Sequence, residues 1–492
     1  MHQEPFKVKT TPYSHQVDSY YRVKSLLKQR GGMAILSEQG TGKSKVLIDY
    51  LDSLADETGY LGMHLIVAPN VVVENWRDEI AIHSRYYGEH VHILRQVRKK
   101  RIELATSGKP GIYVINYEGI RTLKYKGGGK KVIANHHLAK QPWDTVACDE
   151  ITRINSRSSQ QSRGMHDFTK WCPKAKRIGM TGTPITDEPM NIFSIFRFID
   201  PTVFGTDYYA FEHRYAETQK EIIYIGGKPR EVKNICGYKN EDELSKKMYE
   251  SSVRWMKKDC LDLPERTWQT RLIPWDKDQK RIYEDMQKDM LSEIGNDQWI
   301  SSANAIANLI KLRQITQGWV YTDREGSYKM VCKNPPKLKA LKEAIEDSAG
   351  QVLVFFTFKA DLKIIKEFFD KNKITYAVIA GEVSMEGRSD AAKQIQNGSV
   401  RVGLCQTKVT QFGLTLTAAS TAIYYSNGFG MEERLQSQDR IHRIGQKCKV
   451  TYIDLCMEDS IDVSICKMHR KKVKIAERIT MTQFRQLAKG FA

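Results

Sequence analysis

The sequence predicts an α/β protein built from two doubly wound, parallel-sheet lobes with helical insertions. Short apolar runs rich in β-forming residues alternate with helical stretches, and this alternation occurs twice along the 492 residues. Apolar strands that alternate with helices are typical of a parallel sheet covered on both faces. The chain also exceeds the roughly 250–300 residues at which a single hydrophobic core stops growing. We therefore expect each series of strands to form its own lobe.

The predicted strands of the first lobe are Met33–Ser37, Leu65–Pro69, Tyr113–Asn116, Thr145–Glu150 and Arg177–Gly182. Those of the second lobe are Gln351–Phe356, Ile374–Gly381, Val400–Gln406, Ala422–Ser426 and Lys449–Cys456. Ligands of doubly wound sheets gather beyond the carboxyl ends of the strands. We therefore expect the polar residues that follow these strands to form the functional site.

The predicted domains are an N-terminal lobe, a C-terminal lobe and a basic helical tail, over residues 1–262, 263–460 and 461–492. The charged segment from about residue 205 to 262 is predicted to be a helical extension of the first lobe, with a turn at Gly226-Gly227. Leu263-Pro264 marks the crossover to the second lobe. The tail that begins at Ile461 has the spacing of a basic amphipathic helix.

The charge balance predicts a polyanionic partner. The chain has 77 basic and 58 acidic residues, a formal net charge of +19. Such an excess favours binding to nucleic acid, although a merely soluble basic protein is the alternative. The nine cysteines include no Cys-x-x-Cys pair, which argues against a zinc ribbon or a disulfide framework. With no apolar signal core and no long apolar stretch, we expect no membrane segment and a cytoplasmic, intracellular location (the host cytoplasm if the protein is viral).

A phosphate-binding loop is predicted at Ser37-Glu-Gln-Gly-Thr-Gly-Lys-Ser44, between a predicted strand and a predicted helix. Its glycines let backbone N–H groups converge on phosphate oxygens at a helix N-terminus. Lys43 is predicted to reach the terminal phosphates and Ser44 to bind Mg²⁺. The other residues predicted to bind the nucleotide here are Gln39, Gly40, Thr41 and Gly42. Ser37 stands where the strict pattern has glycine.

Two adjacent carboxylates, Asp149 and Glu150, end a predicted apolar strand. Because neighbouring side chains of a strand point to different faces, Asp149 is predicted to hold Mg²⁺ while Glu150 polarises the attacking water. A helix cap or turn is the alternative for an isolated pair of this kind. Gln16 precedes the loop and is predicted to recognise the edge of adenine, with a plain surface amide as the alternative.

Residues 436–446 read Gln-Ser-Gln-Asp-Arg-Ile-His-Arg-Ile-Gly-Gln. Arg440 and Arg443 are three apart on a predicted helix, so both guanidiniums are expected on one face. A fixed pair of permanently charged groups suits the negative charge that builds on a transferring phosphoryl group. Together with the early phosphate loop, the pair predicts ATP held by two lobes and an ATP-driven motor.

With these motifs, the chain resembles the Swi/Snf-like family of superfamily 2 helicase-type ATPases. The last motif carries most of the resemblance, since only Ser437 departs from a specified position, where the family has alanine. Other segments follow in the family's order and extend the resemblance over roughly residues 12–480: Leu65–Asn70, Ile115–Glu118, Trp143–Ser156, Met180–Pro184 and Lys257–Asp259 with Leu263-Pro264.

The resemblance implies two RecA-like lobes, ATP with Mg²⁺ as cofactors, and tracking along double-stranded DNA without strand separation. By matching positions it implies that Lys43 and Ser44 bind the phosphates and Mg²⁺, and that Asp149 and Glu150 are the metal and water carboxylates. It implies that Arg440 and Arg443 are arginine fingers and that Gln436 senses the nucleotide. The residues it implies for DNA phosphates are Asn70 and Asn116 in the first lobe and Thr357, Thr407 and Lys408 in the second.

Three positions depart from the family pattern: Ile151-Thr152 after the carboxylates, Thr410-Gln411 in the fifth motif and Trp255 before the crossover. The departure at Ile151-Thr152 puts the coupling between hydrolysis and motion in doubt. The departure at Thr410-Gln411 predicts a different shape for the DNA-facing loop. Two basic clusters, Arg95–Arg101 and Lys124–Lys131, are predicted either to grip backbone phosphates or to be solvated surface.

These observations predict a monomeric, DNA-stimulated ATPase that translocates on duplex DNA and remodels branched DNA or protein–DNA complexes. A short motor of this kind fits a viral or bacterial role, such as displacing bound RNA polymerase, by analogy alone. A strand-separating or RNA-directed helicase of the same superfamily is one alternative. A nucleotide-gated DNA clamp with little turnover is the other, and Thr152 keeps it open.

Overall fold

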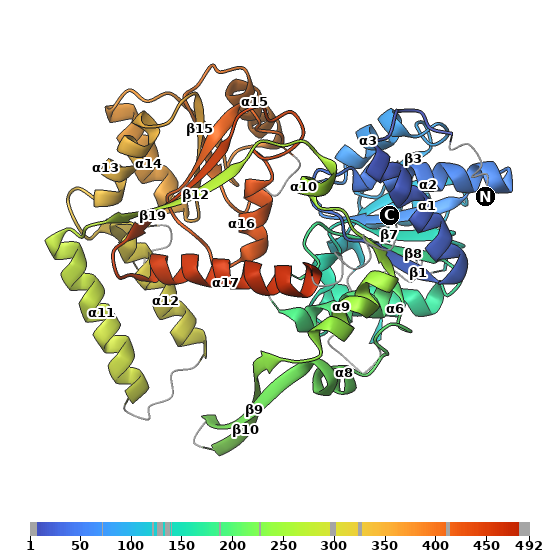
Figure 1. Cartoon of the computed structure of the whole chain (residues 1–492), viewed down its shortest axis with the longest axis horizontal. Coiled ribbons are helices and arrows are strands. Elements are labelled where there is room, and N and C mark those ends of the chain that lie inside the picture. Colours follow the sequence, from blue (N-terminus) through green and yellow to red (C-terminus); the bar gives the residue numbers. More distant parts are fainter. Residues whose placement is uncertain are drawn as a thin grey trace. The chain divides into compact units, whose positions relative to one another are not determined.

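The computed structural model describes residues 7–70, 72–120, 123–124, 131–132, 138, 140–185, 188–225, 228–295, 302–322, 327–409 and 414–481. These residues form two compact units (Figure 1). The first takes in the described parts of 1–218 and 235–262 and the helical residues from 476, and the second takes in 219–234 and 263–475. Each unit is built on one parallel sheet.

The sheet of the first unit is parallel throughout. Its strand order is β11 (Ser252–Val253), β1 (Gly32–Ile35), β8 (Lys176–Met180), β7 (Thr145–Cys148), β2 (Met63–Ala68), β4 (Gly111–Asn116) and β3 (Val91–Ile93). One face is covered by α1 (Ser14–Gln29), α2 (Lys43–Thr58) and α3 (Asn75–His83). The other face carries α6 (Gln160–Trp171) and α7 (Ile192–Ile199).

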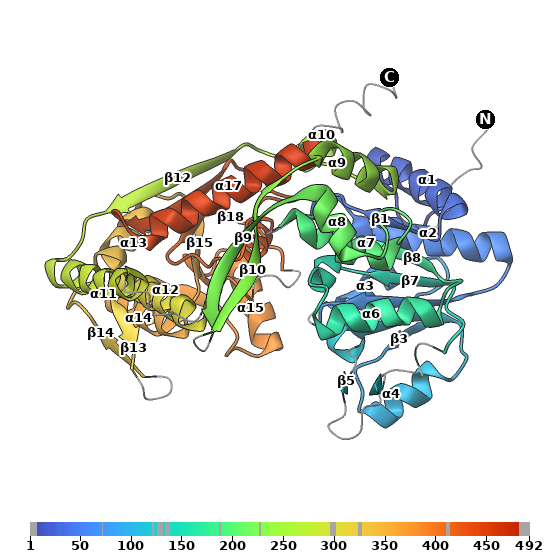
Figure 2. The same cartoon turned by 90° about the horizontal axis from the view of Figure 1, so that it is seen from below.

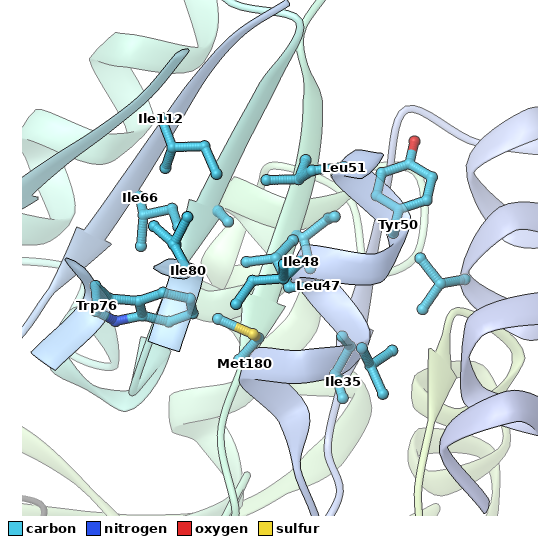
Figure 3. Packing of buried hydrophobic residues seen from close by; sticks show 14 of the residues in the cluster. Ile35, Leu47, Ile48, Tyr50, Leu51, Ile66, Trp76, Ile80, Ile112 and Met180 are labelled. Atoms are coloured by element: carbon cyan, nitrogen blue, oxygen red, sulfur yellow. The ribbon is translucent and has the colours of Figure 1, made fainter. Parts of the chain in front are cut away.

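The core of the first unit lies between α2 and the strands (Figure 3). Leu47, Ile48 and Leu51 project from α2 toward Ile66 and Ile112 of β2 and β4. Every one of these side chains is fully buried, and each contributes about 1.5–3 kcal/mol of hydrophobic stabilisation. This packing fixes the start of α2, and with it the loop that joins β1 to α2.

On the opposite face of the sheet, Gly179 lets the neighbouring elements pack close to the strands. A Cβ on Gly179 of β8 would lie 2.5 Å from the Cδ1 of Ile151 and 2.6 Å from that of Ile199. Only glycine lets α7 and the 3₁₀ turn η2 (Ile151–Ile154) approach the sheet so closely. The turn η2 follows Asp149 and Glu150 directly, so this contact fixes the backbone that carries the two carboxylates.

The second sheet is also parallel throughout. Its order is β12 (Arg266–Ile273), β19 (Val450–Met457), β18 (Ala419–Tyr424), β15 (Gln351–Phe356), β17 (Val402–Gln406) and β16 (Tyr376–Ile379). Helices α13 (Pro336–Glu346) and α14 (Lys359–Lys371) cover one face, and α15 (Met385–Gln396) packs on the other. The two parallel sheets, covered on both faces, confirm the predicted fold class, and all ten predicted strands are present.

The remaining elements extend the two units. In the second unit, α11 (Lys277–Gly295), α12 (Ser302–Thr316) and α17 (Ile461–Met481) share a small core, and the hairpin β13 (Trp319–Tyr321) and β14 (Tyr328–Met330) follows α12. The helix α16 (Met431–Gln438) precedes the turns that hold Arg440 and Arg443. The first unit adds α4 (Arg98–Ala105), η1 (Tyr117–Ile120), the short pair β5 (Leu123–Lys124) and β6 (Lys131–Val132), η3 (Pro189–Asn191), α8 (Tyr208–Tyr215), α9 (Glu241–Glu250) and α10 (Lys257–Cys260). No helix in the described part of the chain is long and apolar enough to cross a bilayer.

The predicted helical extension at about 205–262 is only partly helical, and the prediction was wrong for its middle. Helices α8 and α9 flank a long hairpin of β9 (Ala216–Ile225) and β10 (Lys228–Tyr238), drawn in green in Figure 2. The run Ile222-Ile-Tyr-Ile225 before Gly226-Gly227, followed by a segment that contains Val232, Ile235 and Tyr238, is compatible with a tight β-hairpin. The charged residues between the apolar ones masked this alternation. The glycine pair itself lies outside the described residues.

The edge strand β12 was not predicted. Its sequence, Arg-Thr-Trp-Gln-Thr-Arg-Leu-Ile, is largely polar, because an edge strand has one neighbour and much exposed surface. It pairs in parallel with β19 over its whole length, and the ring of Trp268 stacks on Tyr452 with centroids 5.8 Å apart. The predicted tail helix is present as α17, and its residues Ile461 and Ile465 pack against Tyr283, Leu312 and Ile315.

Candidate functional site

The loop between β1 and α2 adopts a conformation that depends on its glycines. Gly40 and Gly42 have φ angles of +81° and +86°, in the left-handed region that favours glycine. Gly42 directly precedes Lys43, the first residue of α2. The unsatisfied N–H groups at a helix N-terminus favour a bound anion. The two glycines and the helix N-terminus suit a bound anion, and Ser44 is half-buried in the first turn of the helix. Phosphate binding by Gln39, Gly40, Thr41, Gly42, Lys43 and Ser44 stays a prediction.

Gln16 and His15 of α1 brace this loop from the side. A ring nitrogen of His15 lies 2.8 Å from the carbonyl oxygen of Thr41, and Gln16 Nε2 donates to the same oxygen at 3.2 Å. The Oε1 of Gln16 accepts a hydrogen bond of 3.0 Å from the backbone N–H of Tyr13. Gln16 is almost fully buried, so it is not the plain surface amide considered from the sequence. Its recognition of adenine stays a prediction.

We expect Gly42→Ala to weaken nucleotide binding and to destabilise the protein by about 2 kcal/mol, because Gln16 must move and lose its hydrogen bond to the Thr41 carbonyl oxygen. The backbone φ of +86° already costs a residue with a Cβ about 1 kcal/mol, and the added Cβ would collide with Gln16 Nε2. The measurements are urea unfolding and titration with a fluorescent ATP analogue.

Gly59→Ala is the matched control for that variant. Gly59 ends the same helix α2 with φ +74°, and no atom lies within 4 Å of its Cβ position. This variant therefore carries the backbone strain without the collision and should lose only about 1 kcal/mol while binding nucleotide normally. Equal losses in the two variants would show that the packing of Gln16 on the loop is unimportant.

The residues just before the crossover are bonded to the phosphate loop, which the sequence did not reveal. The hydroxyl of Ser37 accepts from the Trp255 N–H at 3.0 Å, and a Glu38 carboxylate oxygen accepts from the Lys257 N–H at 2.6 Å. Inside the loop, Lys43 Nζ donates to the Glu38 carbonyl oxygen at 3.2 Å. Ser37 departs from the strict phosphate-loop pattern and Trp255 from the family pattern, and here the two residues contact each other. A local pattern cannot reveal such a pair, because 218 residues separate its members.

Glu150 has a left-handed backbone, with φ +48° and ψ +57°. The strand β7 ends at Cys148, two residues earlier than predicted, so the pleat of a strand does not separate the two carboxylates as expected. The left-handed turn at Glu150 sets its direction instead. A non-glycine residue in this region costs of order 1–3 kcal/mol and is found mainly at functional sites.

Three aromatic and amide groups hold the two acids in place. Trp76 Nε1 donates to Asp149 Oδ2 at 3.1 Å, and the Tyr117 hydroxyl donates to the Asp149 carbonyl oxygen at 2.8 Å. Gln39 Nε2 donates to Glu150 Oε1 at 2.8 Å. Burial, together with the charge of Glu150, raises the pKa of Asp149, while the nearby Lys43 opposes the shift. Two close carboxylates favour a bound cation, which relieves their repulsion, while Lys43 and the helix N-terminus favour a bound phosphate.

The acids fit Mg²⁺ bound together with a nucleotide. No three His, Cys, Asp or Glu side chains come together within the described ranges, so the protein offers no complete metal cage there. Mg²⁺ is usually held by one or two carboxylates and by substrate phosphates, which matches this donor set. The Oε2 of Glu150 is buried and accepts no hydrogen bond from any described group. That oxygen is available to a water molecule.

Asn70 and Asn116, predicted to meet DNA phosphates, come together at the carboxyl ends of β2 and β4. Asn116 Nδ2 donates to Asn70 Oδ1 at 3.2 Å, and a guanidinium nitrogen of Arg95 donates to the same oxygen at 3.3 Å. Arg95 opens one of the basic clusters noted in the sequence. The other cluster, Lys124–Lys131, lies largely outside the described residues. Asn70, Asn116 and Arg95 form a hydrogen-bonded group at this edge of the sheet, which we call the asparagine cluster. Asn70 and Arg95 are exposed, and Asn116 is half-buried.

In the second unit the predicted DNA contacts also follow strand ends, but they differ in exposure. Thr357 follows β15 and donates its hydroxyl to the Ser426 carbonyl oxygen at 3.2 Å. Thr407 follows β17 and is buried, and both its hydroxyl and its N–H donate to the Phe356 carbonyl oxygen. Lys408 is exposed. The contacts of all three with phosphates stay predictions, and Thr410-Gln411 lies outside the described residues.

The predicted helix around Arg440 and Arg443 is wrong, because α16 ends at Gln438 and both arginines lie in the turns that follow. Arg440 Nε donates to the Gln436 carbonyl oxygen at 3.2 Å, and an Arg443 guanidinium nitrogen donates to the Leu414 carbonyl oxygen at 3.5 Å. Long-range contacts hold these turns. His442 bonds the Pro264 carbonyl oxygen at 2.8 Å, and Gln446 Nε2 donates to the carbonyl oxygens of Thr417 and Ala419 at 3.1 and 2.9 Å.

Gln436, predicted to sense the nucleotide, lies on α16 and is almost fully buried. Its Nε2 donates to Glu432 Oε1 at 3.0 Å, and its Oε1 accepts no hydrogen bond from the described groups. Thr152, the departure after the carboxylates, is buried in η2. The roles of Gln436 and Thr152 stay predictions.

Comparison with known proteins gives two matches to protein families. A model of the SNF2-related domain matches residues 15–318, and a model of the helicase conserved C-terminal domain matches residues 336–445. The chromodomain-helicase-DNA-binding protein 1-like of Danio rerio is 25% identical over 479 residues, which cover 94% of this chain and 43% of the relative. The ISWI chromatin-remodeling complex ATPase CHR17 of Arabidopsis thaliana is 26% identical over 477 residues, which cover 91% of this chain and 40% of the relative.

The chain thus spans about two fifths of the length of the curated relatives it matches. Among solved structures, the SWI2/SNF2 ATPase core of Sulfolobus solfataricus in complex with double-stranded DNA aligns over 97% of this chain and 95% of that chain, at 21% identity and a TM-score of 0.45. The match to residues 15–318 alone covers more than half of the 492 residues. The chain therefore belongs to the SNF2-related family of helicase-type ATPases.

Proposed function

We propose that the protein is a DNA-dependent ATPase that translocates on double-stranded DNA and remodels branched DNA or protein–DNA complexes as a monomer. The observation that carries the proposal is the way the asparagine cluster adjoins the residues that hold Asp149. Asn116 immediately precedes Tyr117, whose hydroxyl bonds the Asp149 backbone at 2.8 Å. Asn70 begins the segment that leads to Trp76, whose indole bonds the Asp149 carboxylate at 3.1 Å.

This arrangement supplies a physical route between a nucleic-acid contact and the nucleotide site. A backbone phosphate that engages the asparagine cluster acts on the ends of β2 and β4. These ends lead into α3, which carries Trp76, and into η1, which begins with Tyr117, and both residues bond Asp149. Asparagine and arginine donors bind phosphate without reading base sequence, as a translocase requires. The net charge of +19 adds a salt-sensitive attraction to the same polyanion.

Each predicted catalytic residue has a proposed role in ATP hydrolysis. The N-terminus of α2 and Lys43 hold the terminal phosphates of ATP, and Ser44 and Asp149 would hold Mg²⁺, which neutralises charge on the phosphates. Glu150 orients the attacking water through the buried oxygen that accepts no other hydrogen bond from the described groups. Arg440 and Arg443 supply positive charge to the transferring phosphoryl group.

ATP hydrolysis at fixed salt tests the proposal, with no nucleic acid, duplex DNA, single-stranded DNA or RNA present. We expect duplex DNA to stimulate turnover strongly and Lys43→Ala to abolish it, because Lys43 is assigned to the phosphates. Preference for RNA or single strands would favour the helicase alternative. No turnover with any nucleic acid would favour the nucleotide-gated clamp.

Target displacement needs a second assay. The proposed targets are a branched DNA junction and a DNA-bound protein such as a stalled RNA polymerase. Displacement of a triplex-forming strand from duplex DNA, dependent on ATP and absent in Lys43→Ala, is the expected result for a duplex translocase. Unwinding of a forked duplex without triplex displacement would contradict it.

A further inference from the structure

A cavity of about 650 Å³ lies in the first unit where α6, α7 and α8 meet, and Figure 2 shows these three helices together. Its basic lining comes from Arg157 in the loop before α6, Arg163 on α6 and Arg197 on α7. Tyr208 and Tyr209 at the start of α8 complete the wall. No residue assigned to ATP or to duplex DNA lies on these helices. The cavity is therefore separate from the residues assigned to ATP and to duplex DNA, and its volume falls in the roughly 300–1,000 Å³ range of small-ligand pockets.

The lining presents hydrogen-bond donors to a ligand. Arg157, Arg163 and Arg197 form no ion pair within the part of the chain that the structure describes. Asp207 is the carboxylate in the lining, and its Oδ1 caps α8 by accepting from the N–H groups of Tyr209 and Ala210 at 2.8 and 3.4 Å. Three guanidiniums with no acid of their own favour an anion with several oxygens, as in a phosphate.

Two tyrosines place an aromatic surface beside the arginines. The guanidinium carbon of Arg157 lies over the Tyr208 ring, 4.0 Å from its centroid, and 5.3 Å from the centroid of Tyr209. The Tyr208 ring packs in turn on Phe193 of α7, with centroids 5.5 Å apart. This stack fixes Arg157 in one position and leaves its N–H edge for a ligand. Tyr209 is 67% exposed, so its ring is accessible.

We propose that this cavity binds a nucleotide of an unpaired nucleic-acid strand, with its phosphate on the arginines and its base on the Tyr209 ring. Basic groups beside an exposed aromatic ring are the usual means of binding single strands without sequence preference. A base in a duplex is already stacked and paired, so its flat face cannot reach Tyr209. An acidic peptide would satisfy the arginines but offers no flat partner to the tyrosine. The proposal goes beyond duplex translocation and does not depend on ATP hydrolysis.

Fluorescence anisotropy of a labelled oligo-dT with the full chain, without ATP, tests this site. We expect Tyr209→Ala to weaken oligo-dT binding by about five- to a hundredfold, the usual effect of removing one stacked base. We expect Arg163→Ala with Arg197→Ala to weaken it by about tenfold or more. The slope of log K against log salt should become shallower by about 0.7 for each phosphate that the variant no longer neutralises. Binding to a blunt duplex should change less than about twofold in both variants.

Lys339→Ala with Lys393→Ala is the matched control, because it removes the same charge from exposed positions of the second unit. If the control lost as much oligo-dT affinity as the arginine variant, only net charge would matter and the proposed site would be wrong. An equal loss of duplex affinity would overturn the assignment to an unpaired strand. Competition by AMP or inorganic phosphate as strong as by oligo-dT would assign the cavity to a free small ligand instead. Because the readout is binding, a failure here is distinguishable from a failure of the proposed ATPase.

Discussion

Replacing Glu150 with glutamine should lower the rate of ATP hydrolysis by about 10²–10⁴-fold, the usual contribution of a group that activates the attacking water. Glutamine has the same length, so Gln39 can still donate to its Oε1, and the left-handed backbone carries an equally large side chain. What changes is the oxygen Oε2, which is buried and accepts no hydrogen bond from the described groups. An amide nitrogen in its place donates instead of accepting and cannot orient water for attack. The measurement is steady-state turnover together with the Kd for ATP, which should change less than about threefold.

Gln39→Ala separates the chemical role of the Glu150 carboxylate from its orientation by a hydrogen bond. This variant keeps the carboxylate and removes the 2.8 Å hydrogen bond that aims it. We expect a smaller loss of turnover, of roughly ten- to a hundredfold, because a hydrogen bond to a charged carboxylate contributes about 1.5–3 kcal/mol. If Glu150→Gln kept near-normal turnover, Glu150 would have no part in hydrolysis. If Glu150→Gln lowered both turnover and the affinity for ATP, the role of Glu150 would be to hold the loop between β1 and α2.

The fold and the phosphate loop could be predicted because both depend on local sequence. Apolar runs of strand length between helices specify two parallel sheets, and the structure has a strand at every predicted position. Gly40, Gly42 and Lys43 lie in one short segment, so their spacing alone predicts a helix N-terminus facing phosphates. Asn70 and Asn116 both follow parallel strands, which places them at one edge of the sheet, and their side chains do bond each other.

The contacts that hold these groups in place could not be predicted, because they join distant segments. Trp76 bonds Asp149 across 73 residues, and Trp255 bonds Ser37 across 218. The left-handed conformation of Glu150 has no sequence signal, since nothing about a glutamate favours it. The error at Arg440 and Arg443 has the same origin. Their spacing suits a helix, but contacts of His442 and Gln446 with distant backbone override it.

Arg440→Ala and Arg443→Ala should each lower DNA-stimulated ATP hydrolysis by about 10³–10⁵-fold, the range for removal of an arginine finger. Both side chains donate charge-assisted hydrogen bonds to backbone carbonyls, and removing such a bond should cost the second unit about 1.5–3 kcal/mol of stability. The measurements are turnover with duplex DNA, the Kd for ATP and the urea midpoint.

Two other arginines of the second unit, Arg434 and Arg388, serve as controls for a loss of stability and for the loss of a positive charge. Arg434 is buried on α16, bonds Asp454 at 2.6 Å and lies 3.2 Å from the Tyr424 ring centroid. Its removal leaves Asp454 buried without its ion-pair partner, so Arg434→Met should cost about 3–5 kcal/mol and lower the urea midpoint sharply. Arg388 donates to the carbonyl oxygens of Ala380 and Gly381, and Arg388→Ala should leave turnover unchanged. If Arg440→Ala and Arg443→Ala lowered both turnover and stability, as much as expected for Arg434→Met, the two residues would be structural. Turnover that falls with ATP affinity intact, and with a smaller loss of stability than at Arg434, would identify them as the groups that act on the phosphoryl transfer itself.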